Sequence, residues 1–271
     1  MDDRPHSLPI VVVDPDEHAL LKATAECADV NLGNFIRCKV IEATETQLLE
    51  RRLVNIPAEH WDRIERWFET PPRDIPALRR SSAIPPVPSP RPLTNDDNRY
   101  AFDCQREPLN RWFWDHAWQD QETDIARTHV AADPATGNII GFASLSAAEI
   151  KREPPPSDGI EPQIWLTALP AVLLGRLAIN QRYQGLGHAR SLMRFALASA
   201  VSFSSNIGCF CMLTHPLDDQ VRTFLRTFGF EEIPGDPAGG MAIRIIDLEH
   251  NGVGSPSTVR HNNAFNETAI L

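Results

Sequence analysis

The first 50 residues carry the hydrophobic pattern of a strand followed by two helices. Residues 8–13 form a continuous apolar run that is typical of a short strand. Asp14 is suited to cap a helix over 16–28, and Pro15 fits the first turn of that helix. Asn31 offers a second cap, and apolar residues recur at helical spacing from Leu32 to about Leu49, which predicts a second helix. So short a unit can hardly bury a core alone, and we therefore expect it to pair with a second copy.

A proline-rich stretch follows these elements. Residues 84–92 cannot continue a helix or a central strand, because proline lacks the backbone N–H and fixes φ. We expect an extended linker there. The preceding segment, 51–83, carries large apolar side chains that either anchor it on another surface or form one face of a helix in a fused core: Trp61, Ile64, Trp67 and Phe68.

Beyond the linker, helical and strand patterns alternate in the manner of an α/β domain. The predicted order is a helix at 107–121, a hairpin of strands 127–133 and 138–145, a strand at 173–179, a helix after Gly187, a strand at 207–214 and a helix ending at 228–230. Polar residues without periodicity follow from 249 onward, where we expect disorder.

Charge and cysteine content exclude several classes of protein. The net charge of −10 argues against indiscriminate binding to nucleic acid. Five cysteines without a Cys-x-x-Cys spacing fit reduced thiols better than disulfides or a metal site. No apolar stretch approaches the length of a membrane span, and the N-terminus is too polar for a secretory signal, so we expect a cytoplasmic protein.

The candidate chemistry lies in the run Arg182-Tyr-Gln-Gly-Leu-Gly187, between the strand at 173–179 and a helix. Small residues at Gly185 and Gly187 let backbone N–H groups approach an anion, and the N-terminus of a helix favours negative charge. Two glycines before a helix are also typical of a mere tight turn. The spacing alone therefore leaves both interpretations open.

The glycine run resembles the coenzyme A loop of the GNAT acetyltransferase superfamily, and the flanking elements follow in that family's order. The resemblance implies an α/β (α+β) GNAT fold with a mixed, mostly antiparallel sheet, and acetyl-CoA as cosubstrate. The backbone of Leu177, Ala178 and Ile179 would hold the pantetheine arm and the acetyl carbonyl. The remaining implied cofactor-binding residues are Arg182, Gln184, Gly185, Leu186, Gly187, His188, Ala189 and Arg190.

Further motifs resemble the acetyltransferase toxins of bacterial toxin–antitoxin pairs. They are Phe102-Asp-Cys104, Ala126-Arg-Thr128, Gly141-Phe-Ala-Ser-Leu145 and Leu217-Asp-Asp219. Those toxins acetylate the amino group of an aminoacyl-tRNA. The resemblance thus implies an aminoacyl-tRNA substrate.

Residues 8–50 resemble the ribbon-helix-helix antitoxins, and the stretch after them resembles the antitoxins' neutralising tail. The resemblance implies a homodimer formed through the N-terminal module. In that family the paired strands read DNA with polar or basic side chains, but residues 7–13 here contain no Lys or Arg. DNA binding is therefore weakly supported, and pairing without DNA is at least as well supported.

The toxins' last helix presents a tyrosine at the position of Leu225, where its hydroxyl can protonate the departing thiolate. Leucine cannot donate a proton, and the loss of a general acid costs about 10²–10⁴-fold in rate. His215, at the end of the preceding strand, is the nearest titratable substitute. Its alternative role is that of a histidine simply hydrogen-bonded at a strand end.

The sequence therefore predicts five parts: a ribbon-helix-helix-like dimerisation module at 1–50, a neutralising segment at 51–83, a linker at 84–92, a GNAT domain at 93–248 and a disordered tail at 249–271. The leading hypothesis is a fused antitoxin–toxin N-acetyltransferase of reduced activity. One alternative is a catalytically inactive GNAT-fold regulator or CoA-binding protein. Another is a small-molecule or peptide N-acetyltransferase.

Overall fold

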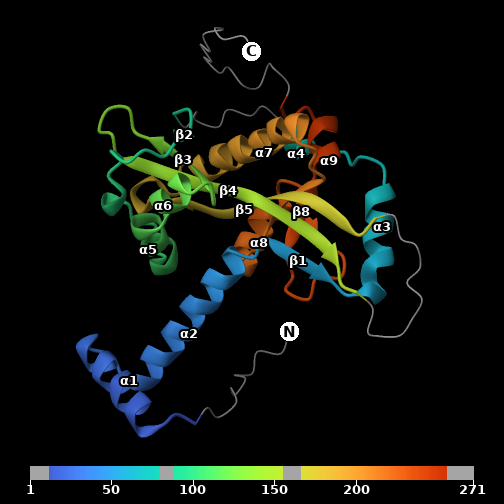
Figure 1. Ribbon diagram of the computed structural model, residues 1–271. Coiled ribbons are helices and arrows are strands. Elements are labelled where there is room, and N and C mark those ends of the chain that lie inside the picture. The colour runs from blue at the N-terminus through green and yellow to red at the C-terminus, as the bar shows by residue number, and fades with distance from the viewer. Residues whose placement is uncertain (1–11, 80–87, 155–165, 255–271) are drawn as a thin grey trace, which may run out of the picture. The chain divides into compact units, whose positions relative to one another are not determined.

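The computed structural model describes residues 12–79, 88–154 and 166–254 (Figure 1). The chain divides into two compact units, Met1–Gln47 and Leu48–Leu271.

The first unit contains two helices, α1 (Pro15–Cys27) and α2 (Leu32–Leu49), and α2 runs past the boundary into the second unit. Asp14 caps α1 in a capping box. Its carboxylate accepts from the Glu17 N–H at 2.8 Å, and the Glu17 carboxylate accepts from the Asp14 N–H at 2.9 Å. Both helices predicted from periodicity are confirmed within one residue. The strand expected at 8–13 lies mostly outside the described residues, and Val12 and Val13 belong to no strand.

A single sheet of eight strands forms the second unit. Its order is β2-β3-β4-β5-β6-β8-β7, with β1 paired to β4. All neighbours are antiparallel except β1/β4 and β5/β6, which confirms the mixed, mostly antiparallel sheet. The strands are β1 (Leu53–Ile56), β2 (Arg91–Pro92), β3 (Arg127–Ala132), β4 (Ile139–Arg152), β5 (Ala168–Ile179), β6 (Cys211–Thr214), β7 (Glu231–Glu232) and β8 (Met241–Arg244).

Helices cover both faces of this sheet. The α7 face carries a core of side chains from α7 (His188–Asn206), α8 (Asp219–Arg226), α9 (Ile245–His250) and the short α4 (Pro76–Arg79). The opposite face packs against α5 (Glu107–Asp115) and α6 (Ala117–Glu122) at one end, and against α3 (Trp61–Glu69) at the other, where β1 adds side chains to the core.

A bulge in β5 changes which face its side chains occupy. Ser144 of β4 pairs with Arg176, and Leu145 pairs with Leu174, so Gly175 is the extra residue. Before the bulge, Leu173 packs on the α3 side and Leu174 on the α7 side. After it, the even-numbered side chains, those of Arg176 and Ala178, turn to the α5 side.

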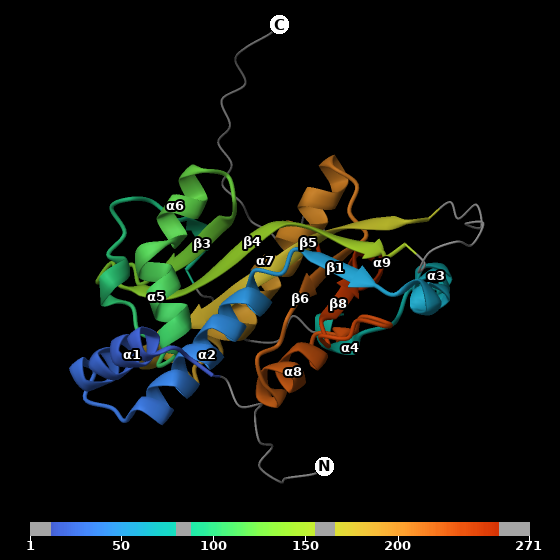
Figure 2. The same cartoon turned by 60° about the horizontal axis from the view of Figure 1, so that its bottom comes forward.

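Strand β1 comes from the segment before the proline-rich stretch and completes one edge of the sheet. β3 pairs with the first half of β4, up to Leu145, and β1 pairs in parallel with its last four residues, Glu149 to Arg152 (Figure 2). Val54, Ile56 and Trp61 then share a buried core with strands β4, β5, β6 and β8. The segment therefore belongs to the same compact unit as the sheet.

Three of the predicted elements differ from the structure in their boundaries. The helix expected at 107–121 breaks at His116, which ends α5 and begins α6, and this break lets Trp112, Phe113 and Ala117 all be buried. The strand expected from 207 begins at Cys211, and β5 begins earlier than 173, at Ala168.

The proline-rich stretch and the tail also differ in part. Residues 84–87 lie outside the described residues, but Arg91 and Pro92 form edge strand β2 against β3. An edge position tolerates Pro92, because no N–H is needed on the outer side. The tail expected from 249 is ordered at Asn251, which is 4% exposed and accepts from the Ile75 N–H at 2.8 Å. Residues 255–271 are outside the described part.

Candidate functional site

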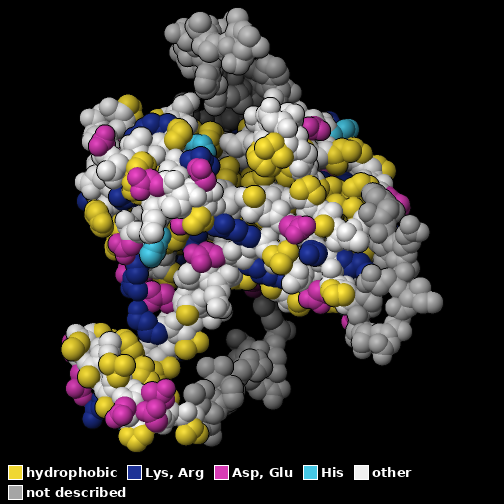
Figure 3. Space-filling model, in the orientation of Figure 1, with side chains coloured by type: hydrophobic (Ala, Val, Ile, Leu, Met, Phe, Trp, Pro, Cys, Tyr) yellow, Lys and Arg dark blue, Asp and Glu magenta, His cyan; other side chains and the backbone are white. Residues whose placement is uncertain are grey.

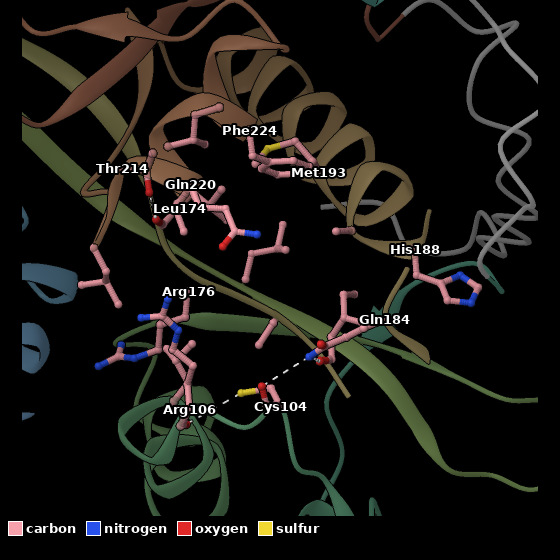
Figure 4. A pocket seen from close by; sticks show the side chains of 18 of the residues that line it. Cys104, Arg106, Leu174, Arg176, Gln184, His188, Met193, Thr214, Gln220 and Phe224 are labelled. Atoms are coloured by element: carbon pink, nitrogen blue, oxygen red, sulfur yellow. Dashed lines mark hydrogen bonds between the residues drawn. The ribbon is translucent and has the colours of Figure 1, made fainter. Parts of the chain in front are cut away.

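A cleft opens where β5 and β6 separate. Their parallel pairing ends at Leu173 and Leu213, while β5 continues to Ile179. A cavity of about 720 Å³ lies beside this free edge of β5, between α5 and α8 and under the start of α7 (Figure 4). A strand edge without a neighbour offers N–H and C=O groups to a ligand.

The loop after β5 presents the N-terminus of α7 to the cavity. Gly185 and Gly187 have φ of +76° and +86°, values that side chains disfavour. Gly187 is the N-cap of α7 and supplies no side-chain hydrogen bond to it. The first N–H groups of this 19-residue helix are thus not capped by a side chain, and they form a suitable site for an anion.

Gln184 ties this loop to its surroundings. Its side-chain amide donates to the carbonyl of Ile179 at 3.0 Å and to that of Cys104 at 3.3 Å. In Figure 4, Gln184 and His188 lie at one end of the cavity, and Arg106 and Arg176 lie at the other.

Nine of the eleven predicted cofactor-binding residues line the cavity: Leu177, Ala178, Ile179, Gln184, Gly185, Gly187, His188, Ala189 and Arg190. Arg182 and Leu186 are exposed and do not line it. The Arg182 backbone N–H donates to the Asn180 side chain at 3.1 Å, which helps to shape the turn.

Leu225 lines the cavity from α8 and is 2% exposed. Asp218 begins this helix by accepting from the Val221 N–H at 2.8 Å. Leu225 also packs in the core on the α7 side of the sheet, together with Phe228 and Met193. Its side chain therefore borders the cleft with an aliphatic surface that carries no proton.

His215 lines the cavity directly after β6, and its ring is held by the chain itself. Its Nε2 lies 3.0 Å from the Arg51 carbonyl, which can only accept, so Nε2 carries the proton. Nδ1 is buried without a hydrogen-bond partner. Burial lowers the pKa of this imidazole, and the nearby Arg51 charge lowers it further, against the opposite influence of the Arg51 carbonyl and Asp236.

Several cavity residues were missed by the reasoning from sequence. Cys104 lies within the motif at 102–104 and Thr214 ends the strand predicted at 207–214, but neither was assigned a role. Arg106 and Gln220 lie outside the glycine run and the predicted strands. Arg106 forms an ion pair with Asp218, the cap of α8, across the mouth of the cleft. Thr214 donates to the Leu174 carbonyl at 2.8 Å, bridging the two strands where they begin to separate.

Arg176 was also missed. It is 6% exposed, its guanidinium lies 4.1 Å from the ring centre of Trp112, and it pairs with Glu50 at 2.8 Å. Burial lowers its pKa, and the hydrogen bond that the guanidinium donates to Glu50 opposes that shift. The bulge at Gly175 is the cause of this placement, and a bulge leaves no signal in the periodicity of the sequence.

Residues 53–79 are joined to the rest of the second unit by hydrogen bonds and ion pairs as well as by the shared core. The Trp61 indole donates to the Leu166 carbonyl at 2.8 Å. Arg73 forms ion pairs with Asp247 at 3.0 Å and Glu231 at 3.1 Å. Arg244, 1% exposed, donates to the carbonyls of Trp67, Thr70 and Pro71.

The Arg side chains that line the cavity are Arg106, Arg176 and Arg190, and no Asp or Glu among the described residues lines it. On the face shown in Figure 3, basic side chains alternate with acidic and apolar ones and form no continuous patch. Within the described ranges, no helix is long and apolar enough to cross a membrane.

Comparison with known proteins identifies both parts of the chain. Residues 92–230, about half of the chain, match the family described as "Acetyltransferase (GNAT) family", and the chain belongs to that family. Residues 11–83 match the family described as "Antitoxin TacA 1-like". An acetyltransferase domain thus follows an antitoxin-like domain in a single chain.

The similar proteins are toxins of the acetyltransferase type. A tRNA-acetylating toxin of Mycobacterium tuberculosis (strain ATCC 25618 / H37Rv) is 28% identical over 149 residues, which cover 55% of this chain and 87% of the toxin.

Two solved structures share the fold. The structure of AtaT complexed with acetyl-methionyl-tRNAfMet is 25% identical, with a TM-score of 0.53, over 60% of this chain and 97% of that one. The structure of AtaTR bound with AcCoA is 25% identical, with a TM-score of 0.54, over 60% of this chain and 96% of that one.

Proposed function

We propose that this chain transfers the acetyl group of acetyl-CoA to the amino group of an aminoacyl-tRNA. The observation that carries the proposal is the free edge of β5 leading directly into the uncapped N-terminus of α7 beside one cavity. Similarity to a tRNA-acetylating toxin supports the choice of acceptor.

The two ends of the cavity suit the two ends of acetyl-CoA. The N–H groups at Gly187 to Ala189 would bind the pyrophosphate, since the helix dipole and unpaired donors favour negative charge. The backbone from Leu177 to Ile179 would hold the pantetheine arm as an added strand. An N–H on that edge would stabilise the charge that develops on the acetyl carbonyl oxygen during transfer.

The site offers no free proton donor at Leu225 or at His215. The amine must lose a proton, and the departing thiolate must gain one. Leu225 has none to give, and the Nε2 proton of His215 already binds the Arg51 carbonyl. We therefore expect slow transfer, with His215 serving only if that hydrogen bond opens.

The test uses the purified full chain, acetyl-CoA labelled in the acetyl group, and aminoacylated or deacylated tRNA. We expect label in the aminoacylated tRNA alone, with acetyl-CoA bound stoichiometrically. Label in free amines but not in tRNA would contradict the acceptor and favour a small-molecule acetyltransferase.

The aliphatic side chain of Leu225 at the cavity favours a second candidate function, binding of acetyl-CoA without acetyl transfer. A protein that binds acetyl-CoA without transferring the acetyl group would keep the β5 edge and the α7 N-terminus and would have no need of a proton donor. Tight acetyl-CoA binding with no labelled product from any amine would support this alternative.

We further propose that the N-terminal module forms a homodimer. Leu20, Val40 and Ile41 of its two helices are 46–69% exposed, which leaves apolar surface for a second copy to cover. Light scattering of the full chain would test this proposal. DNA binding is a weaker proposal, because no basic side chain lies at 7–13; retarded migration of the upstream DNA of its own gene would support it.

A further inference from the structure

Arg176 is a buried cation that the proposed acetyl transfer does not use. Its side chain is 6% exposed, stacks over Trp112, and lines the cavity at the end opposite the glycine loop. Its Nε is buried and has no hydrogen-bond partner. A buried guanidinium requires an anion, because an unpaired charge away from water is costly.

The anion that accepts a hydrogen bond from Arg176 comes from outside the acetyltransferase region, while Asp120 of α6 acts on it through its charge. Glu50 directly follows α2 and pairs with Arg176 at 2.8 Å, yet its side chain is 48% exposed. One partner is thus fixed in the wall of the cleft, and the other can leave into solvent. Such a carboxylate is exchangeable for another anion.

The neighbours of Glu50 run across the cleft at the same end. The Leu49 carbonyl lies 3.3 Å from the position that a Cβ on Gly175 would take, so glycine permits this close approach. The Arg51 carbonyl bonds to His215, and the Arg51 guanidinium pairs with Asp236 at 2.8 Å. Residues 49–51 therefore pass from β5 to the far side of β6, over the space between the two strands.

We propose that Arg176 is the binding site for a phosphate group of the acceptor RNA, and that Glu50 occupies this site in cis as a competing anion. The inference rests on the proposed function, because it assumes an RNA-linked amine. In an aminoacyl ester the carboxyl group is esterified, so the anions near the amine are the phosphodiesters of the terminal nucleotides. The guanidinium matches such an oxyanion in geometry and charge.

The coenzyme's own phosphates are an unsuitable ligand for Arg176. Three residues of extended strand, about 10 Å, separate Arg176 from Ile179, and the glycine loop lies beyond that end. The bulge at Gly175 also turns Arg176 to the α5 face, away from α7. Arg176 and the N-terminus of α7 are therefore two separate anion sites in one cavity.

The experiment measures binding of an unacylated CCA trinucleotide to the full chain by calorimetry. Glu50→Gln removes the competing charge with little change in size. Glu59→Gln is the matched control, because Glu59 lies in the same segment, is exposed, and does not line the cavity. We expect Glu50→Gln to bind the trinucleotide about tenfold more tightly than the wild type, with Glu59→Gln unchanged and acetyl-CoA affinity equal in all three.

A second variant keeps the test independent of folding defects. The double variant Glu50→Gln, Arg176→Gln removes both charges of this ion pair together, so neither partner is left with an unpaired charge. We expect it to lose the tenfold gain, with its fold confirmed by circular dichroism. The Michaelis constant for aminoacyl-tRNA, but not the affinity for acetyl-CoA, should fall in Glu50→Gln.

The outcomes separate this inference from the function on which it rests. Equal trinucleotide affinity in the wild type, Glu50→Gln and Glu59→Gln would overturn it, as would a gain that survives in the double variant. The expected binding pattern without any acetylated tRNA would support the anion site and reject the transferase activity. Acetylated tRNA with no effect of Glu50 would leave the activity standing and reject the site.

Discussion

At the scale of single residues, Leu225 allows binding of acetyl-CoA to be tested separately from transfer of its acetyl group. It borders the cavity from α8 at 2% exposure, and the sequence resemblance predicts a tyrosine at this position. Leu225→Tyr should raise the single-turnover rate of acetyl transfer by about 10²–10⁴-fold, since it supplies the missing acid.

The control for this change is Leu225→Phe, which adds the same ring without the hydroxyl. Overpacking at this buried site should lower the free energy of unfolding by about 1–3 kcal/mol in both variants. Equal transfer rates in the two variants would show that proton donation does not limit the reaction, and would direct attention to binding of the acceptor.

Two histidines, the buried His215 and the half-buried His129, make stability depend on pH. Burial lowers the pKa of both imidazoles below the ordinary histidine value of about 6.5, so the native state binds fewer protons than the unfolded state below that pH. The free energy of unfolding should therefore be constant above pH 6.5 and fall as the pH drops below it, by at most about 1.4 kcal/mol per pH unit for each histidine.

Tryptophan fluorescence during urea unfolding at pH 7.5 and 5.5 would measure this effect, because all six tryptophans follow residue 47 and report on the second unit. His215→Gln keeps an N–H for the Arg51 carbonyl and should reduce the loss at pH 5.5. His116→Gln, an exposed site, is the control. An identical loss in both variants would contradict the assignment to His215.

At the scale of elements, the start of α7 sets affinity for acetyl-CoA. A Cβ on Gly185 would meet no atom within 4 Å, but it would project beside the cavity where we place the pyrophosphate. Gly185→Ala should weaken acetyl-CoA binding at least about tenfold, measured by calorimetry.

Gly137, in the turn between β3 and β4, provides a matched control. Its φ of +72° is close to the +76° of Gly185, and its Cβ would also meet open space. Both alanine variants should therefore lose about 1–2 kcal/mol of stability from the same backbone strain. Equal affinity for acetyl-CoA in the two variants would argue against phosphate binding at the loop.

The elements that could be predicted from sequence are those with strong local signals. Periodicity and an N-cap located α1 and α2, and the glycine run located the start of α7 together with the part of the cavity wall next to it. The mixed, mostly antiparallel sheet was predicted from the resemblance to the GNAT family. These features depend on residues close together in the sequence.

The features missed depend on contacts between distant residues. No local pattern shows that β1 would pair with the end of β4, because the pairing joins residues 53–56 to 149–152. Likewise, Arg176 meets Glu50 across 126 positions and only because a bulge turns it toward α5. The break at His116 follows from the burial of Trp112 and Ala117 on one surface, which tertiary packing decides.

At the scale of the whole molecule, the antitoxin-like region is divided between the two compact units. Helix α1 and most of α2 lie in the first unit, while residues 48–79, which include β1, α3 and α4, belong to the second. The side chains of β1 and α3 share a core with apolar strand residues of the acetyltransferase region: Ile150, Leu169, Leu173, Cys211, Leu213 and Ala242. Residues 48–79 are thus part of the folded core of the second unit.

Two truncations test this division. Residues 48–271 should fold cooperatively and remain monodisperse, because the boundary at Gln47 removes none of the shared core. Residues 80–271 should aggregate or melt at a much lower temperature, since Trp61 and Ile64 no longer cover the sheet. Buried Arg244 would also lose its three carbonyl acceptors.

Thermal unfolding and size-exclusion chromatography of both fragments provide the measurement. Adding residues 48–79 as a separate peptide should restore the cooperative transition of the shorter fragment, because β1 and α3 would dock on the exposed edge and face. If residues 80–271 instead melt like residues 48–271 without the peptide, the antitoxin-like segment is a removable cover, and neutralisation by its release would become possible.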